Sequence, residues 1–334
     1  MIFHQNKVRI YLLVYVDDIL LTGNNTQAMN DLVGKLKSKF TMKHLGLAHQ
    51  FLGIKIDRYP DKYFLSQSLY AKSILQMAEL PKCNSVANPS ITKPAALSPP
   101  PTPIFDAVLY RRLIGALQYL TLTHPDISYA VNALSQHMHS PEPLHTVMLK
   151  KLLRYIQGTV DFGLPLTRSH LNLTTYSDAD WASDPITRRS TSGFCTFLGE
   201  TLISWTVKKQ TTVSRSSTES EYRALASATA DTIWIKRLLA DFQVSHTQPV
   251  DVFCDNTSTI ALANNPVFHA RTQHIEIDQR FVRDNIQNNT IRLLPINTVD
   301  QKADILTKPL NTPRYKLLRN KLTIGPNTQL AGAC

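Results

Sequence analysis

The sequence predicts an α/β protein whose second half holds a mixed sheet flanked by helices. From residue 170 onwards, three hairpin-linked strands are followed by alternating helices and strands, a pattern that favours both antiparallel and parallel pairing. Residues 107–157 have a helical period, whereas six prolines between 83 and 106 interrupt any regular pattern. Hydrophobic residues make up 43% of the 334-residue chain, which is enough for buried cores and excludes wholesale disorder.

The first 82 residues predict a small unit of strands and helices. A β-branched and aromatic run over 8–16 and a second apolar run over 19–21 predict a hairpin with Asp17 and Asp18 at its tip. A polar stretch over 24–26 is suited to cap a following helix. The remaining elements expected in this unit are a helix over about 27–39, strands near 50–57 and 63–66, and a helix over 67–79.

The middle of the chain predicts a proline-rich linker or extended loop over 83–106 and then a helical segment. Helices are expected over roughly 107–122, 126–138 and 143–157, with Pro125 and Pro141 placed where new helices begin.

The second half predicts five strands and four helices. The long helix carries apolar residues on one face at helical spacing, and Gly199-Glu200 joins two strands as a hairpin. The strands are expected at 171–178, 192–198, 201–206, 250–254 and 291–296, and the helices at 218–242, 257–264, 274–288 and 300–308.

The net charge of +11 and a pI near 9.5 favour a polyanionic partner, nucleic acid before membrane. The four cysteines lie far apart and form no CxxC pair, which excludes a zinc ribbon and disfavours a disulfide framework. We expect neither a signal peptide nor a membrane-spanning helix, because Asp17 and Asp18 interrupt the apolar run near the N-terminus. These features favour an intracellular protein, of the cytoplasm or nucleus, over a secreted one, and they predict no membrane partner; they do not determine the compartment.

Four acidic residues of the second half fall at the ends of predicted elements. They are Asp178, Glu221, Asp255 and Asp304. Ligands gather at strand ends in open α/β sheets, and converging carboxylates with room for water suit Mg²⁺. A pair of ions about 3.5–4 Å apart would activate water and stabilise a leaving oxygen in phosphodiester cleavage.

Structural roles explain the same four residues one by one. Asp178 and Asp255 are suited to turns after strands. Glu221 has the spacing of a capping-box partner for Thr218, and Asp304 that of a first-turn carboxylate facing a helix dipole.

A set of longer motifs favours the functional interpretation. From Tyr176 to Pro309 the chain resembles the RNase H domain of copia-type retrotransposon polyproteins. The matching strings are Tyr176-Ser-Asp-Ala-Asp-Trp-Ala182, Thr187-Arg-Arg-Ser-Thr-Ser-Gly-Phe194, Ile203-Ser-Trp205, Ser214-Arg-Ser-Ser-Thr-Glu-Ser-Glu-Tyr-Arg-Ala-Leu225, Cys254-Asp-Asn256, His274-Ile-Glu276 and Ala303-Asp-Ile-Leu-Thr-Lys308.

The resemblance implies an RNase H-like fold in which Asp178, Glu221, Asp255 and Asp304 hold the metal. Glu219 is an alternative to Glu221, and Asp180 an alternative to Asp178. The chain departs from the wider superfamily because it has no histidine between 296 and 304, where cellular enzymes of this fold often carry one. That departure implies slower proton transfer or product release.

The N-terminal Asp pair resembles the palm-domain pair that holds Mg²⁺ in reverse transcriptases. Burying both carboxylates in an apolar hairpin would be costly without a cation, whereas a solvated turn is the structural alternative. The following segments extend this resemblance over about residues 8–315: Phe40-Thr-Met-Lys-His-Leu-Gly46, Phe51-Leu-Gly-Ile-Lys55, Phe64-Leu-Ser-Gln67, Ile114-Gly-Ala-Leu-Gln-Tyr-Leu120 and Thr123-His-Pro-Asp-Ile127.

The resemblance implies a C-terminal part of a Pol polyprotein. It divides the chain into a partial reverse-transcriptase palm (1–82), the linker (83–106), a helical thumb or connection (107–169), the RNase H-like domain (170–312) and a C-terminal tail (313–334). A polymerase palm needs a further Asp on an earlier strand, and none of the sixteen residues before Asp17 is acidic. We therefore expect no polymerase activity from this chain alone.

Two basic groups are candidates for nucleic-acid binding. Lys208, Lys209 and Arg215 lie beside the proposed site, and Lys150, Lys151 and Arg154 share a helix that could equally be a solvated basic face. The expected partner is an RNA–DNA hybrid or other nucleic acid, and an RNA–DNA hybrid would be recognised by shape, phosphates and 2′-hydroxyls. The expected function is Mg²⁺-dependent cleavage of the RNA strand, with Mn²⁺ as a substitute. The alternative is a catalytically silent retrotransposon remnant that at most binds nucleic acid.

Overall fold

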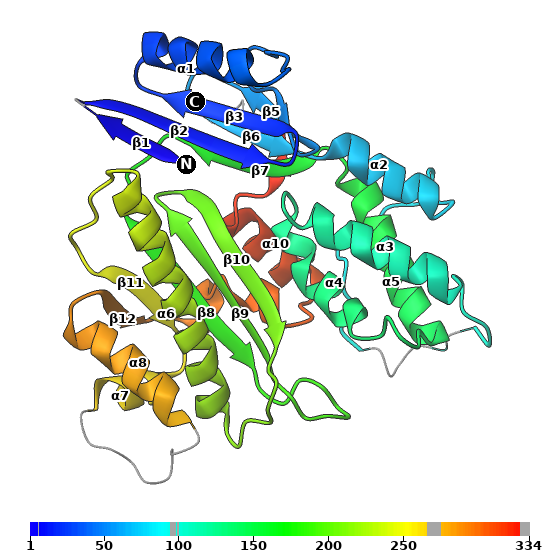
Figure 1. The fold of residues 1–334 in the computed structure, drawn as a ribbon. Coiled ribbons are helices and arrows are strands. Elements are labelled where there is room, and N and C mark those ends of the chain that lie inside the picture. The colour runs from blue at the N-terminus through cyan, green and yellow to red at the C-terminus, as the bar shows by residue number, and fades with distance from the viewer. Residues whose placement is uncertain (6, 94–97, 99, 266–274, 328–334) are drawn as a thin grey trace.

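The computed structural model describes residues 1–5, 7–93, 98, 100–265 and 275–327. Three sheets and the helices that cover them make up the molecule (Figure 1). His274 and residues 94–97 and 99 of the proline-rich segment lie outside the described residues. Among the described helices, none combines the length and apolar character needed to cross a lipid bilayer.

The predicted mixed sheet is present, which confirms the α/β fold class. Its order is β10-β9-β8-β11-β12, with antiparallel pairing from β10 to β8 and parallel pairing from β8 to β12. Hairpins join the first three strands and helical crossovers join the last two, as the sequence pattern predicted. The strands are β8 (Leu173–Asp180), β9 (Thr191–Leu198), β10 (Thr201–Lys209), β11 (Val250–Cys254) and β12 (Ile291–Pro295).

Helices cover both faces of this sheet (Figure 1). The Thr175 hydroxyl bonds to that of Thr232 on the long helix at 2.9 Å, so α6 lies against one face. A Cβ at Gly193 would meet Leu306, so α9 lies against the other face. Their bounds, with those of the neighbouring helices, are α6 (Ser217–Asp241), α7 (Thr257–Asn264), α8 (Glu276–Gln287), the 3₁₀ helix η4 (Thr298–Asp300) and α9 (Asp304–Thr307).

A second five-stranded sheet joins strands from distant parts of the chain. It has the order β13-β7-β6-β5-β4, and every pair in it is antiparallel. This sheet crosses the segment boundaries expected at 82 and 169, because β7 pairs with β6 on one side and with β13 on the other. The strands are β4 (Gln50–Phe51), β5 (Ile54–Arg58), β6 (Lys62–Ser66), β7 (Phe162–Thr167) and β13 (Gly325–Pro326).

The N-terminal hairpin belongs to a separate three-stranded sheet on which helix α1 packs. The tip carries Asp17 and Asp18, both exposed, and Val16 turns with a φ of 49°. The Tyr11 hydroxyl donates to the carbonyl of Phe242 at 2.9 Å, which joins this sheet to the end of α6. The elements are β1 (Ile2–Gln5), β2 (Val8–Tyr15), β3 (Asp18–Gly23) and α1 (Thr26–Lys39).

The helical segment packs into the largest hydrophobic core, which continues into the mixed sheet and the C-terminal helix. Phe197 of β9 and Leu318 of α10 are buried in this core beside residues of α3 and α5. The elements are α2 (Ser68–Met77), α3 (Ala107–Leu120), the 3₁₀ helix η2 (Pro125–Ile127), α4 (Ser128–Ser135), α5 (Pro143–Gly158) and α10 (Thr312–Lys321).

Residues 313–334, expected as a C-terminal tail, include most of α10 and all of β13. Leu318, Leu322 and Ile324 are buried, so this part of the segment belongs to the core. The Tyr315 hydroxyl donates to Asp126 Oδ2 at 3.1 Å, and the Tyr155 hydroxyl donates to the same oxygen. Helix α10 is therefore fixed to the helical segment by both apolar burial and hydrogen bonds.

Candidate metal centre

Strand β8 and helix α9 bring the first and last predicted carboxylates together. Asp178 is fully buried near the end of β8, and Asp304 opens α9. Gly193, the partner of Asp178 on β9, permits this approach because a Cβ there would lie 2.7 Å from the Thr307 side chain. Helix α9 is shorter than the expected helix over 300–308, since residues 298–300 form a separate 3₁₀ turn.

The start of α6 separates the roles of its two glutamates. Ser216 is the N-cap and accepts from the backbone N–H of Glu219, so the helix starts earlier than the spacing of Thr218 predicted. Glu219 accepts from the backbone of Arg215 and pairs with Arg223 at 2.9 Å. The capping role therefore belongs to Glu219, and Glu221 is directed toward the other carboxylates.

Two overlapping groups of ligand atoms result from this arrangement. In each group the ligand atoms lie within 4.8 Å of one another, and Asp255 belongs to both. One group joins Asp178, Asp255 and Asp304; the other joins Glu221, Cys254 and Asp255. The structure thus gathers the four carboxylates that the sequence singled out, and Asp255 is the most exposed of them. Asp180 lies on the same strand, less deeply buried than Asp178.

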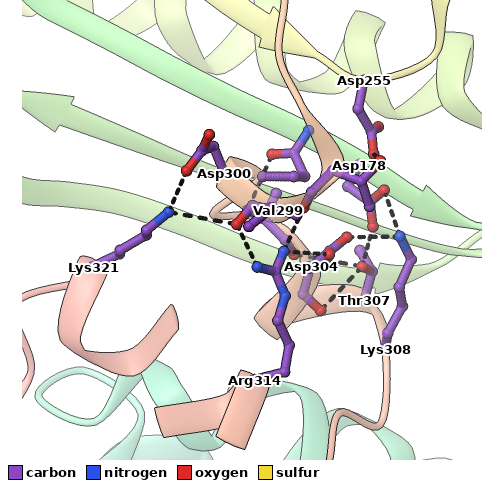
Figure 2. Close-up of polar contacts among 12 residues, drawn as sticks. Asp178, Asp255, Val299, Asp300, Asp304, Thr307, Lys308, Arg314 and Lys321 are labelled. Atoms are coloured by element: carbon purple, nitrogen blue, oxygen red, sulfur yellow. Dashed lines mark hydrogen bonds and ion pairs between the residues drawn. The ribbon is translucent and has the colours of Figure 1, made fainter. Parts of the chain in front are cut away.

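An ammonium and a hydroxyl from α9 and its C-cap contact Asp178 and Asp304 (Figure 2). The Lys308 ammonium donates to Asp178 Oδ1 at 3.0 Å and to Asp304 Oδ1 at 2.6 Å. Thr307 donates its hydroxyl to the other oxygen of Asp178. Because the negative charges of Asp178 and Asp304 repel each other, Lys308 supplies the counter-charge that holds the two carboxylates together.

Burial and mutual repulsion shift the acidities of this group. Burial raises the pKa of Asp178 to about 6, against the attraction of Lys308. Burial also raises the pKa of Glu221 well above its usual value, and the charges of Asp178 and Asp255 add to this effect. Burial would lower the pKa of Lys308, but Asp178 and Asp304 outweigh it and raise the pKa. A further cation would reverse the shifts on both acids.

The donor set fits a hard divalent cation. Glu221 is buried, yet its Oε2 has no hydrogen-bond partner within the described residues. An orphaned buried carboxylate oxygen is costly unless a ligand or ion completes it. Carboxylate oxygens are the ligands that Mg²⁺ and Mn²⁺ prefer, so Asp178, Glu221, Asp255 and Asp304 suit either ion.

The predicted nucleic-acid-binding residues divide into two settings. Lys208 and Lys209 line a pocket of about 380 Å³ together with Arg223, and Arg215 is exposed at the start of α6. Lys209 also pairs with Asp184. Lys208 and Arg215 are therefore exposed, whereas Lys209 is half-buried in its ion pair.

On helix α5 the basic residues hold the proline-rich segment. Lys151 donates to the carbonyl of Ser90, and Arg154 donates to that of Asn84, each at 2.7 Å. Lys150 is half-buried on the same helix. These contacts give Lys151 and Arg154 a structural role that the sequence did not reveal.

Asp17 and Asp18 lie on the N-terminal sheet, apart from this centre. Both are exposed, and neither belongs to the groups of metal-ligating side chains found in the described part of the chain. The structure therefore does not bring them together with the carboxylates of the second half.

Sequence reasoning missed several residues that shape the centre. Thr307 and Lys308 lie within the Ala303–Lys308 motif, but their contacts with Asp178 depend on the packing of α9 against β8. Arg314 comes from α10, in the segment expected as a tail, and pairs with Asp304 at 3.0 Å. A basic residue soon after the Ala-Asp motif was the only available signal for it.

Comparisons with known proteins identify relatives of this chain. A family model described as reverse transcriptase (RNA-dependent DNA polymerase) matches residues 2–92. The Pol polyprotein of transposon RE2 from Arabidopsis thaliana is 41% identical over 97% of this chain, which spans 22% of that relative's length. A putative transposon Ty5-1 protein of Saccharomyces cerevisiae is 30% identical over 64% of this chain and 70% of its own length.

Solved structures resemble the fold more distantly. A foamy viral protease–reverse transcriptase in complex with double-stranded DNA is 13% identical over 86% of this chain and 46% of its own, with a TM-score of 0.48. The class defined by the sequence relatives is that of retroelement polyproteins with a reverse transcriptase region. Within this class, the chain belongs to the copia-type retrotransposon Pol polyproteins.

Proposed function

We propose that the second half of this chain is an RNase H-type endonuclease that cuts the RNA strand of RNA–DNA hybrids. The observation that carries the proposal is the convergence of four carboxylates, with an orphaned Glu221 oxygen, at one end of the mixed sheet. The two groups that share Asp255 are consistent with a pair of divalent ions. The family membership supports a nucleic acid as the substrate.

The four carboxylates of the site differ in burial, which suggests different roles. Asp178, Glu221 and Asp304 are buried and fix the inner side of the centre, whereas Asp255 lies on the side open to a substrate. Mg²⁺, when bound there, supplies an activated water and stabilises the charge on the leaving oxygen. The packing of α9 against β8 holds the carboxylates in place, so little reorganisation is needed when a substrate arrives.

The basic residues around the site favour an acidic substrate that is recognised through its phosphate backbone. Lys208, Lys209 and Arg215 would contact phosphates near the site, and such contacts carry little sequence information. A hybrid helix is recognised through its shape and its 2′-hydroxyls, so we expect weak sequence preference. Binding should weaken steeply with added salt, because neutralised phosphates release counterions.

The experiment is cleavage of a labelled RNA–DNA hybrid by the purified chain in Mg²⁺, with Mn²⁺ as a second condition. Asp178→Asn should lower the rate by at least about a hundredfold, because a metal site contributes several kcal/mol and each 1.4 kcal/mol is tenfold. Asp284→Asn is the matched control, since it removes an exposed carboxylate of α8 from the same domain.

The alternative is a catalytically silent remnant that at most binds nucleic acid. A folded chain that binds the hybrid without cutting it in either metal would support this alternative and refute the nuclease. Primer extension is a separate assay: we expect no incorporation, because Asp17 and Asp18 have no third carboxylate beside them in the described residues.

A further inference from the structure

Helix α10 has two faces with different partners. One face carries Tyr315 and Leu318, which are buried against the helical segment. Tyr315 donates to Asp126 Oδ2 at 3.1 Å, and its ring lies edge-on to that of Tyr155 with centroids 5.6 Å apart. The position of α10 is therefore set by the helical segment and not by the mixed sheet alone.

The other face directs Arg314 at the metal centre (Figure 2). Its Nη2 donates to Asp304 Oδ2 at 3.0 Å, and the guanidinium also donates to the carbonyl oxygens of Thr298 and Val299. Thr298 in turn donates its hydroxyl to Asp255 Oδ2 at 3.0 Å. The Arg314 guanidinium thus positions Asp304 directly and Asp255 indirectly, through Thr298 of η4.

We propose that Arg314 is a positioning residue for the metal centre and that it makes the geometry of this centre depend on the docking of α10 against the helical segment. The inference rests on the proposed metal-dependent function. The Arg314 side chain is only 19% exposed. Its guanidinium bonds a carboxylate of the site and the turn whose Thr298 bonds a second one. Groups that hydrogen-bond to metal ligands and orient them typically contribute about ten- to a hundredfold to metal affinity.

Two effects of Arg314 on a bound cation have opposite signs. Its positive charge repels the cation, so removing the charge alone would strengthen binding. Its three hydrogen bonds orient Asp304 and the turn carrying Thr298, so losing these bonds would weaken binding of the cation. Lysine keeps the charge but cannot form the planar set of bonds. The sign of the change in affinity therefore separates positioning from charge.

The experiment measures divalent-metal affinity of the full chain by isothermal titration with Mn²⁺, independently of cleavage. The variants are Arg314→Lys and Arg314→Gln, with Lys316→Gln as the matched control. Lys316 is exposed on the same helix, so this control removes one positive charge without touching the centre. Thermal unfolding of each variant establishes that α10 remains folded.

If Arg314 positions the ligands, Arg314→Lys and Arg314→Gln both weaken Mn²⁺ binding by about ten- to a hundredfold, and Lys316→Gln leaves it unchanged. Tighter binding in Arg314→Gln with unchanged binding in Arg314→Lys would overturn the inference, because it shows a charge effect alone. Unchanged affinity in both variants would also overturn it. A wild-type chain that binds no Mn²⁺ would instead refute the proposed metal-dependent function on which the inference rests.

Discussion

The buried carboxylates predict that the metal-free chain loses stability as the pH rises from 5 to 7. Asp178 has a folded-state pKa of about 6, above the ordinary value of 3.8. A group whose pKa is raised by folding favours the folded state below its unfolded pKa, and this contribution is lost as the pH rises through the folded value. Chelation followed by a pH titration is therefore the perturbation.

The magnitude follows from the shift. A difference of about two pKa units corresponds to about 3 kcal/mol, of which somewhat more than 1 kcal/mol is lost between pH 5 and 7. The unfolding entropy is about 2 cal/mol/K per residue, so over 334 residues the full effect is about 4 °C in Tm. Between pH 5 and 7 the expected decrease from Asp178 is about 2 °C.

The assay compares the thermal unfolding of the wild-type chain with that of Asp178→Asn, in chelator, at pH 5 and 7. The difference between the two proteins isolates Asp178 from other titrating groups. Adding Mg²⁺ at pH 7 should raise the Tm of the wild type more than that of the variant, because the ion binds the charged carboxylate of the folded state. A difference that stays flat over this pH range, with no Mg²⁺ stabilisation, would refute the reasoning.

Three further predictions test the packing around the centre. Gly193→Ala should destabilise the chain by about 1–3 kcal/mol and weaken metal binding, because the added Cβ would lie 2.7 Å from Thr307. Gly115→Ala should instead stabilise α3 by about 0.5–1 kcal/mol, because no atom lies within 4 Å of its added Cβ. Denaturant unfolding of both variants should show free-energy changes of opposite sign. Glu219→Gln should lower the free energy of unfolding in urea by about 1 kcal/mol, because the cap and the ion pair are lost, but it should retain hybrid cleavage. Glu221→Gln should abolish cleavage. Equal effects of the two variants on cleavage would contradict the assignment of Glu221 to the metal centre. Limited proteolysis should leave a fragment that starts before residue 71, because the largest core continues from residue 71 to residue 324. Survival of a fragment that starts at 165–170 would count against a core shared by the two halves of the chain.

Much of the element order could be read from the sequence because it depends on local periodicity and turn chemistry. The hairpin at the N-terminus, the three helices after the proline-rich segment and the five strands of the mixed sheet lie within a few residues of their predicted positions. Strand β7 was missed because Gly163 and Pro165 lower its strand signal, although pairing with β6 stabilises it.

The four carboxylates were also identified from the sequence, but the choice between neighbours was not. Glu219 and Glu221 differ by two residues, or about 200° around a helix, so a small change in where α6 starts exchanges the faces they occupy. Ser216 fixes that start by capping the helix, and the resulting register directs Glu221 to the centre. Asp178 and Asp180 share one face of β8, so the strand pattern alone does not separate them. Asp178 is the more deeply buried, and its side chain lies with those of Asp255 and Asp304.

The local sequence pattern therefore predicted most of the elements, and its motifs indicated the family and the candidate carboxylates. The tertiary structure decided how the parts combine: β6 pairs with β7, α10 docks on the helical segment, and Arg314 reaches Asp304 from outside the expected domain. The physical reason is range. Periodicity and capping act over one or two turns of chain, whereas the counter-charges and supports of the centre come from segments whose proximity depends on packing.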